Sequence, residues 1–209
     1  MTTRVNLIST VPRAAFPLFV AISLSGCEGT QMRSAAPETA GEAAAQAMNA
    51  SEQPMMDDLL TLAGTAKDKI MGLANAMPEE DYGWAPMDGV RSMSEVFIHI
   101  AADNYFIPVI MGVEAPAETG ITMDYSTVQA YEAQDLSKAE ILEMLEASFA
   151  HLEAAADQTR GDLSAQLAFG SNTFTASSLW VQAVTHLHEH LGQSIAYARA
   201  NEVAPPWSM

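Results

Sequence analysis

Three of the chain's five histidines have a spacing that suits a metal site. His186 and His190 are four residues apart in a segment with helical periodicity, so at about 100° per residue they project from one face of a helix. His99 lies in another helical segment, on a stripe with Val96 and Phe106. Two histidines at i and i+4, with a third from a facing helix, supply three imidazole nitrogens. They leave a coordination position for water or substrate, as in catalytic zinc sites.

The same histidines also fit a chain that binds no metal. An i,i+4 histidine pair is a weak signal alone, and a single interior histidine is more often hydrogen-bonded within the core than bound to a metal. Asp103, one turn after His99, is either a plain polar residue or a partner that orients the His99 ring; we favour the second role. His188 points away from its neighbours and is expected in solvent or at an interface, and His151 is expected at the surface.

Four helical segments must position these residues. The first is expected over about residues 55–76, with an apolar face that includes Leu62, Ala66 and Ile70. The second and third begin at capping boxes, SMSE at 92–95 and SKAE at 137–140, and the second ends near residue 111. The fourth runs from about residue 175 to 200 and carries His186 and His190 on a stripe of small and apolar residues. Four such helices predict an all-α fold, a four-helix bundle.

Two connections in this domain are long. Residues 112–136 are too many for a tight turn, which predicts a crossover with a short helix at about 126–133. Residues 157–175 form the second, in which the segment 169–174 is expected to make a short extended turn. Simple up-down-up-down connectivity is therefore not expected.

The amino-terminal segment has the features of an export signal. Arg4 and Arg13 precede an apolar run at 14–24, which is too short for a permanent membrane span. The run ends in LSGC, which resembles the lipobox of bacterial lipoproteins, and Cys27 is the only cysteine of the chain. We therefore expect a signal peptide at 1–26, a lipid-modified Cys27 and an envelope location, periplasmic or outward-facing. The alternatives are an ordinary signal peptide and a buried free thiol.

Charge and composition restrict the partners of the chain. Nine Lys and Arg oppose 26 Asp and Glu, a net charge of −17, and removing a signal with two Arg and no acid takes it to −19. A polyanion of this kind excludes nucleic acid and leaves the lipid as the only membrane anchor. Residues 28–53 lack aromatic and β-branched aliphatic residues, so 27–53 is expected to be the modified cysteine and a disordered tether. The folded domain is expected at 54–209.

The order of several motifs resembles the DinB-like superfamily of metal-binding four-helix bundles. The segments MPEEDYGWAP (77–86) and RSMSEVFIHIAA (91–102) resemble its first two helices. The segments THLHEHLGQSIAYARAN (185–201) and PPWS (205–208) resemble its last helix and tail. This similarity implies up-down-down-up connectivity with a long crossover between the second and third helices. It also implies a divalent metal, Zn²⁺ or Ni²⁺ being favoured, bound by His99, His186 and His190, and it implies a homodimer.

Two functional hypotheses follow from these observations. The first is a metal-dependent transferase or hydrolase that acts on a small molecule, with Tyr105, Tyr131 and Tyr197 as candidates to line its pocket and no assignable catalytic base. The resemblance includes metal-dependent transferases that use low-molecular-weight thiols, but those thiols are cytosolic and an exported protein would not meet them. The second hypothesis is a non-catalytic envelope lipoprotein whose metal is structural or binds a ligand. A pure interaction module with incidental histidines is the third alternative.

Overall fold

The computed structural model describes the backbone of residues 40–208 and the side chains of residues 54–208. The expected signal peptide, Cys27 and the first part of the expected tether, residues 27–39, lie outside the described residues. Among the helices that are described, none combines the length and the hydropathy that a membrane span requires.

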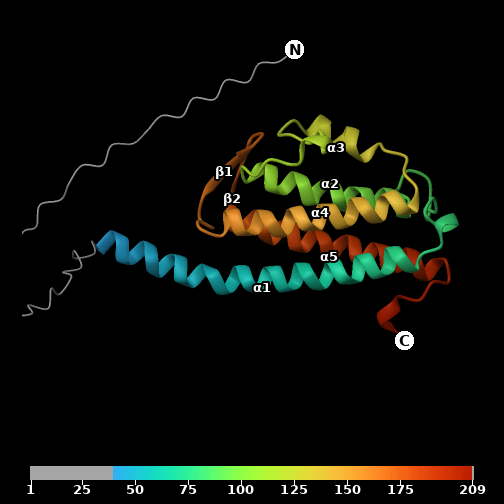
Figure 1. Ribbon diagram of the computed structural model, residues 1–209, viewed down its shortest axis with the longest axis horizontal. Helices are drawn as coiled ribbons and strands as arrows, with labels where there is room; N and C mark the ends of the chain where they lie inside the picture. Colours follow the sequence, from blue (N-terminus) through green and yellow to red (C-terminus); the bar gives the residue numbers. More distant parts are fainter. Residues whose placement is uncertain (1–39, 209) are drawn as a thin grey trace, which may run out of the picture. The chain divides into compact units, whose positions relative to one another are not determined.

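Four long helices form the domain, as the sequence predicted. They are α1 (Ala40–Ala76), α2 (Met93–Ile110), α4 (Lys138–Thr159) and α5 (Ala176–Ala200). Two of them, α1 and α2, each pack against both α4 and α5, which gives a four-cornered bundle with α1 and α2 at opposite corners. Figure 1 shows α1 and α5 running in one direction and α2 and α4 in the other. The predicted up-down-down-up connectivity is confirmed.

Side-chain caps fix where three of these helices begin. Ser92 caps α2 and Ser137 caps α4, and in both cases the hydroxyl accepts the N–H of a glutamate three residues on, whose carboxylate bonds back to the cap. Thr175 caps α5 in the same way with Ser178. The caps satisfy backbone N–H groups that have no partner within the helix. The starts predicted from the boxes of α2 and α4, and the start of α5 predicted near residue 175, are confirmed.

The long link between α2 and α4 is a crossover that carries a short helix, α3 (Tyr125–Glu132), and a 3₁₀ turn at Ala117–Thr119. Asp124 caps α3, and α3 packs on α2. The chain leaves α2 through Gly112, whose φ of 86° lies in the left-handed region that glycine tolerates without strain. The crossover therefore places the end of α3 beside α2, as Figure 1 shows.

A two-stranded hairpin connects α4 and α5, where the sequence predicted only a short extended turn. Strands β1 (Gln166–Phe169) and β2 (Asn172–Thr175) are antiparallel, with Phe169 opposite Asn172. Gly170, with φ 59°, occupies the first position of the two-residue loop, where a positive φ matches the twist of the strands. The hairpin directs Phe169 and Phe174 toward the bundle, where both pack on its apolar core.

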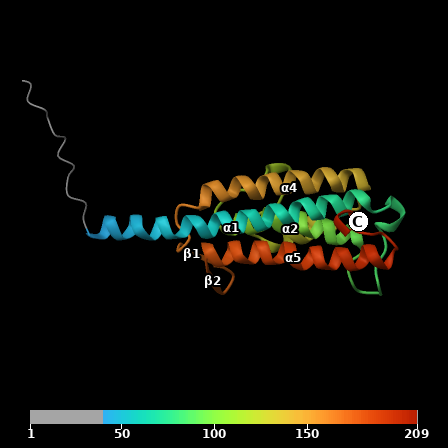
Figure 2. The same cartoon turned by 90° about the horizontal axis from the view of Figure 1, so that it is seen from below.

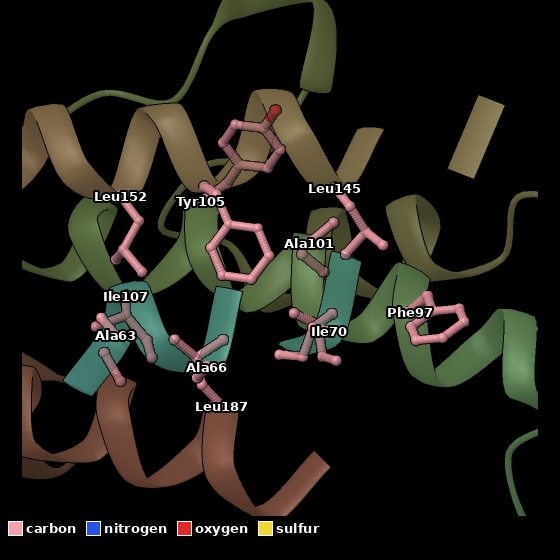
Figure 3. Close-up of a cluster of buried hydrophobic side chains, with 14 of the residues drawn as sticks. Ala63, Ala66, Ile70, Phe97, Ala101, Tyr105, Ile107, Leu145, Leu152 and Leu187 are labelled. Carbon is pink, nitrogen blue, oxygen red and sulfur yellow. The ribbon is translucent and has the colours of Figure 1, made fainter. Parts of the chain in front are cut away.

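The apolar core is continuous through the bundle. Figure 3 shows Ala66 and Ile70 of α1, Ala101 of α2, Leu145 of α4 and Leu187 of α5, which are all buried. The small side chains of Ala66 and Ala101 let the helices approach closely, and the larger side chains fill the space between them. Leu62, predicted on the apolar face of the first helix, is 48% exposed, and its neighbour Ala63 is buried instead.

The first helix begins earlier than the sequence predicted. The backbone of residues 40–53, assigned above to a disordered tether, is helical and continuous with the rest of α1. Alanine, glutamate and glutamine dominate this stretch, and the composition that argued against burial also has high helix propensity. Figure 2 shows these first turns of α1 extending beyond the hairpin. Pro54 is accommodated within α1.

His151 is half-buried, which corrects the surface position expected for it. Its ring lies 5.2 Å from that of Tyr105, between α4 and α2, and its Nε2 is buried without a hydrogen-bond partner. Burial lowers the pKa of His151 below its ordinary value of 6.5. An unsatisfied buried polar atom costs about 1–3 kcal/mol of stability, so this residue destabilises the bundle.

We predict that His151→Leu raises the free energy of unfolding by about 1 kcal/mol at neutral pH, because the unsatisfied nitrogen is removed. Because folding lowers the pKa of His151, the unfolded chain takes up a proton at a higher pH than the folded protein does. The wild type therefore has its full stability above about pH 6.5 and loses stability as the pH falls from there toward the pKa of His151 in the folded protein. The difference between variant and wild type should therefore grow from about pH 7 to pH 5 in urea denaturation. His188→Leu, at an exposed position of α5, is the control. A constant difference across this range contradicts the prediction.

Candidate metal centre

The three histidines singled out by their spacing lie together between α2 and α5. His99 projects from the middle of α2, and His186 and His190 project from adjacent turns of α5. The ring centroid of His99 lies 4.9 Å from that of His186 and 4.7 Å from that of His190, and the centroids of the two α5 rings are 4.4 Å apart. One ligand atom from each residue lies within 4.8 Å of those of the other two. The set is mostly buried, with His99 9% and His190 8% exposed.

Glu132, at the end of α3, holds the His99 ring in place. Its Oε1 lies 2.5 Å from Nδ1 of His99, so the Nδ1–H group donates a hydrogen bond to the carboxylate. Arg91, ahead of α2, donates to the other carboxylate oxygen of Glu132 at 3.3 Å. With Nδ1 protonated, His99 is left with an unprotonated Nε2 that faces the other histidines. Such a carboxylate–histidine pair is the usual arrangement around metal-binding imidazoles.

Asp103 contacts a different histidine from the one expected. Its Oδ2 lies 3.0 Å from Nε2 of His186 across the helix interface, while the Nδ1 of His99 is occupied by Glu132. Side chains of a helix lean toward its N-terminus, so Asp103, one turn after His99, could lean toward that residue. Its short side chain instead contacts His186 on the facing helix. The carboxylate that orients His99 thus comes from α3 and not from α2.

A chain of hydrogen bonds along α5 holds His190. Its Nδ1 lies 2.8 Å from the side-chain oxygen of Gln193, and the amide nitrogen of Gln193 donates to the Tyr197 hydroxyl at 2.9 Å. The amide oxygen accepts only, so His190 carries its proton on Nδ1 and leaves Nε2 for the cluster. Tyr197, expected near a pocket, therefore supports the site through Gln193.

Burial in the cluster favours the neutral form of the two α5 imidazoles. Burial, reinforced by the neighbouring His190, His99 and Arg91, lowers the pKa of His186 to about 3. Burial likewise lowers the pKa of His190. Neutral imidazole is the form that binds a metal, because protonation removes the ligand lone pair.

The two carboxylates beside the histidines respond oppositely to their surroundings. The pKa of Asp103 is raised to about 6, chiefly by burial and against the effect of His99. The pKa of Glu132 is lowered, chiefly by its hydrogen bond with His99. Glu132 therefore stays ionised as the partner of His99, and Asp103 is the carboxylate whose charge is less favoured in this environment.

The remaining predicted residues lie elsewhere. His188 is exposed on α5, as expected, and its Nδ1 lies 2.9 Å from the Val184 carbonyl oxygen. Tyr105 and Tyr131 were expected to line the pocket of the metal site, but their rings pack on each other at 5.9 Å, and Tyr105 also contacts His151 on the α4 side of α2. Tyr131 lines a different cavity, formed by α3 and the crossover segment before it. Of the three tyrosines, Tyr197 alone joins the hydrogen bonds described around the histidines.

Three residues of the site were not found from the sequence: Glu132, Arg91 and Gln193. Gln193 follows His190 by three residues, a spacing that places both on one face of α5 and could have indicated the pair. Arg91 directly precedes the capping box of α2 and carries no signal of its own. Glu132 lies in the crossover, 33 residues from His99, so its role depends on how α3 packs.

An all-α bundle with a histidine cluster between its second and last long helices defines the class of this protein. The chain belongs to the DinB superfamily, whose family model matches residues 64–194. No curated protein matches the chain.

Solved structures share this fold at low sequence identity. A DinB-like protein from Bacillus cereus is 18% identical, with a TM-score of 0.56 over 72% of this chain and 95% of that one. A DinB-like protein from Bacillus subtilis is 18% identical, with a TM-score of 0.51 over 69% and 92% of the two chains. A mycothiol-dependent maleylpyruvate isomerase is 17% identical, with a TM-score of 0.51 over 65% of this chain; the match spans 59% of that protein.

The hydrogen bonds predict the tautomer of each histidine in the metal-free protein. His99 and His190 carry their proton on Nδ1, held by Glu132 and Gln193, whereas His186 carries it on Nε2, which lies 3.0 Å from both Asp103 Oδ2 and His99 Nε2. Long-range ¹H–¹⁵N correlation spectra distinguish these forms. We expect Glu132→Ala to remove the Nδ1 preference of His99 and to leave that of His190 unchanged. A His99 that stays protonated on Nδ1 in this variant would contradict the assignment.

Proposed function

We propose that this DinB-superfamily protein is tethered to the membrane through Cys27 and binds a divalent metal, Zn²⁺ or Ni²⁺, through His99, His186 and His190. We propose further that it is a metal-dependent transferase or hydrolase that acts on a small molecule. The observation that carries the metal site is the convergence of three largely buried imidazoles, two of them held through Nδ1. Such a donor set fits a borderline-soft divalent metal.

The residues of the chain would have distinct roles in this site. His99, His186 and His190 would hold the metal, with Glu132 and Gln193 orienting two of the rings. A bound divalent metal supplies Lewis acidity, which polarises an oxygen or sulfur atom of a substrate. Asp103 lies at the edge of the cluster, where its carboxylate can accept a hydrogen bond from a substrate.

A cavity beside the cluster favours chemistry on a small molecule. Asp103, which contacts His186, also forms part of the wall of a cavity of about 290 Å³. A substrate in this space would meet Asp103, which contacts His186, whereas a purely structural site needs no such space. The neighbouring isomerase is described as mycothiol-dependent. An envelope location would keep such a thiol from this protein, so the proposal does not include a thiol cosubstrate.

Non-catalytic metal binding is the second candidate, and the position of Asp103 favours it. Its carboxylate is close enough to His99 and Glu132 to join them in a second group of metal-ligating side chains. A carboxylate that completes four protein ligands closes a zinc site and makes it structural. The protein would then be an envelope lipoprotein that binds metal or a ligand. A four-coordinate absorption spectrum of the Co²⁺ form that changes in Asp103→Ala would favour this candidate.

Metal analysis of variants tests the ligand set. We expect the purified full chain to hold one equivalent of metal and His99→Ala to lose most of it, because a site with two imidazoles binds far more weakly. His188→Ala, which changes an exposed histidine of the same α5 turn, is the matched control and should keep its metal. Circular dichroism confirms that both variants fold. An unchanged metal content in His99→Ala would remove the proposed site.

The hydrogen bond from His99 to Glu132 should strengthen metal binding. Glu132→Gln keeps the shape of the side chain but removes its charge, so we expect metal affinity to fall by about 10- to 100-fold, the usual effect of losing such a partner. Competition with a chromophoric chelator measures this affinity. Glu146→Gln removes an exposed acid of α4 that pairs with Lys67 and is the charge-matched control. Equal effects of the two substitutions would show that net charge and not the hydrogen bond is responsible.

A further inference from the structure

A separate cavity lies in the crossover between α2 and α4. It has a volume of about 260 Å³, with residues 118–120 on one side and Thr127, Ala130, Tyr131 and Gln134 on the other. None of the three histidines lines it, and neither do the side chains that hydrogen-bond to them. We call this space the crossover cavity, and its chemistry is independent of the metal centre.

The hydrogen-bond donors around the crossover cavity are largely engaged within the protein. The hydroxyl groups of Thr119 and Thr127 each donate to a backbone carbonyl of the crossover at 2.7 Å. The backbone N–H groups of residues 119 and 120 donate to carbonyls three residues earlier. The side-chain nitrogen of Gln134 donates to the Tyr131 carbonyl at 2.8 Å. A ligand that needs several donors, such as a carboxylate or a phosphate, would find few here.

The groups that remain for a ligand are acceptors and an aromatic ring. Glu118 offers a carboxylate, and Gln134 offers its side-chain oxygen. Tyr131 is only 9% exposed, and its ring packs at 5.9 Å on that of Tyr105. Burial, followed by the charge of Glu118, raises the pKa of Tyr105, so the carboxylate acts on the same pair of rings. Carboxylate oxygens and the face of an aromatic ring both attract cations.

The surrounding segment adds to this attraction. Residues 112–136 include five acidic side chains and no lysine or arginine. Glu118 is the one charged side chain among the residues that line the crossover cavity. In a chain of net charge −17, such a segment has a negative potential that raises the local concentration of cations. A cation is therefore the ligand that both the cavity wall and its surroundings favour.

We infer that the crossover cavity is a second ligand-binding site of this protein, which binds a small organic cation with an ammonium group. The ammonium has three N–H donors and would donate to the Glu118 carboxylate and the Gln134 side-chain oxygen. Its carbon chain would lie against the Tyr131 ring. The cavity is smaller than sites for drug-sized molecules, so the carbon chain is short. This site needs no metal and does not rest on the proposed function.

Two probes of equal length test this inference on the purified full chain by NMR titration. Butylammonium and 1-butanol differ in charge, because the amine is protonated at about pH 7. At about 0.1 M NaCl, where weak surface attraction is screened, we expect butylammonium to bind at least about tenfold more tightly than 1-butanol. Its addition should shift the backbone amide signals of residues 118–120 and 127–134. Equal binding of the two probes, or shifts spread over the acidic surface, overturns the inference.

Variants of the cavity wall locate the binding. Glu118→Gln removes the charge and should weaken butylammonium binding by about tenfold, whereas Glu114→Gln removes an exposed acid outside the crossover cavity and should not. Ala130→Trp fills the cavity and should abolish binding, whereas Gln129→Trp changes an exposed neighbour and should not. Wild-type affinity in either Glu118→Gln or Ala130→Trp overturns the inference. His99→Ala should bind butylammonium as the wild type does, whatever its metal content, so this inference and the proposed function can fail separately.

Discussion

Burying three imidazoles between two helices is the constraint on which the rest of this structure depends. Each ring brings two polar nitrogens into a largely water-free interface, and a buried polar group without a partner costs more than a hydrogen bond returns. The chain supplies one polar side chain for each ring: Glu132 for His99, Gln193 for His190 and Asp103 for His186. The long crossover between α2 and α4 is explained by this need, because it brings α3 and its last residue, Glu132, to the site.

The same partners prepare the histidines for a metal. Protonating Nδ1 of His99 and His190 leaves Nε2 unprotonated on each ring, and burial keeps His186 neutral. His186 is the exception in orientation, because its Nε2 faces both Asp103 and His99. A metal at this nitrogen would have to displace the proton that Asp103 accepts. Asp103 and the metal therefore compete for His186, which couples occupancy of the site to the carboxylate at the edge of the cavity.

Local signals carried most of what the sequence predicted. The starts of α2, α4 and α5 follow from the side-chain caps at Ser92, Ser137 and Thr175, which act within one helical turn. Helical periodicity places His186 and His190 on one face of α5, and His99 joins them because it lies on a helix that faces α5. Glu132 could not be found this way, because its distance from His99 depends on how α3 packs after a crossover. Residues 40–53 were misjudged because their composition suits an isolated helix as well as a disordered segment.

The acidic composition of the chain also determines which charges surround this site. A net charge of −17 argues against nucleic acid as a partner, an expectation drawn from the whole composition. Around the histidines the same excess leaves Arg91 as the nearest cation, and Glu132 already binds it. No basic side chain is among the residues that line the adjoining cavity, and Asp103 is the one charged side chain among them. Under the proposed function, a metal bound by the histidines would supply the positive charge that none of these side chains offers.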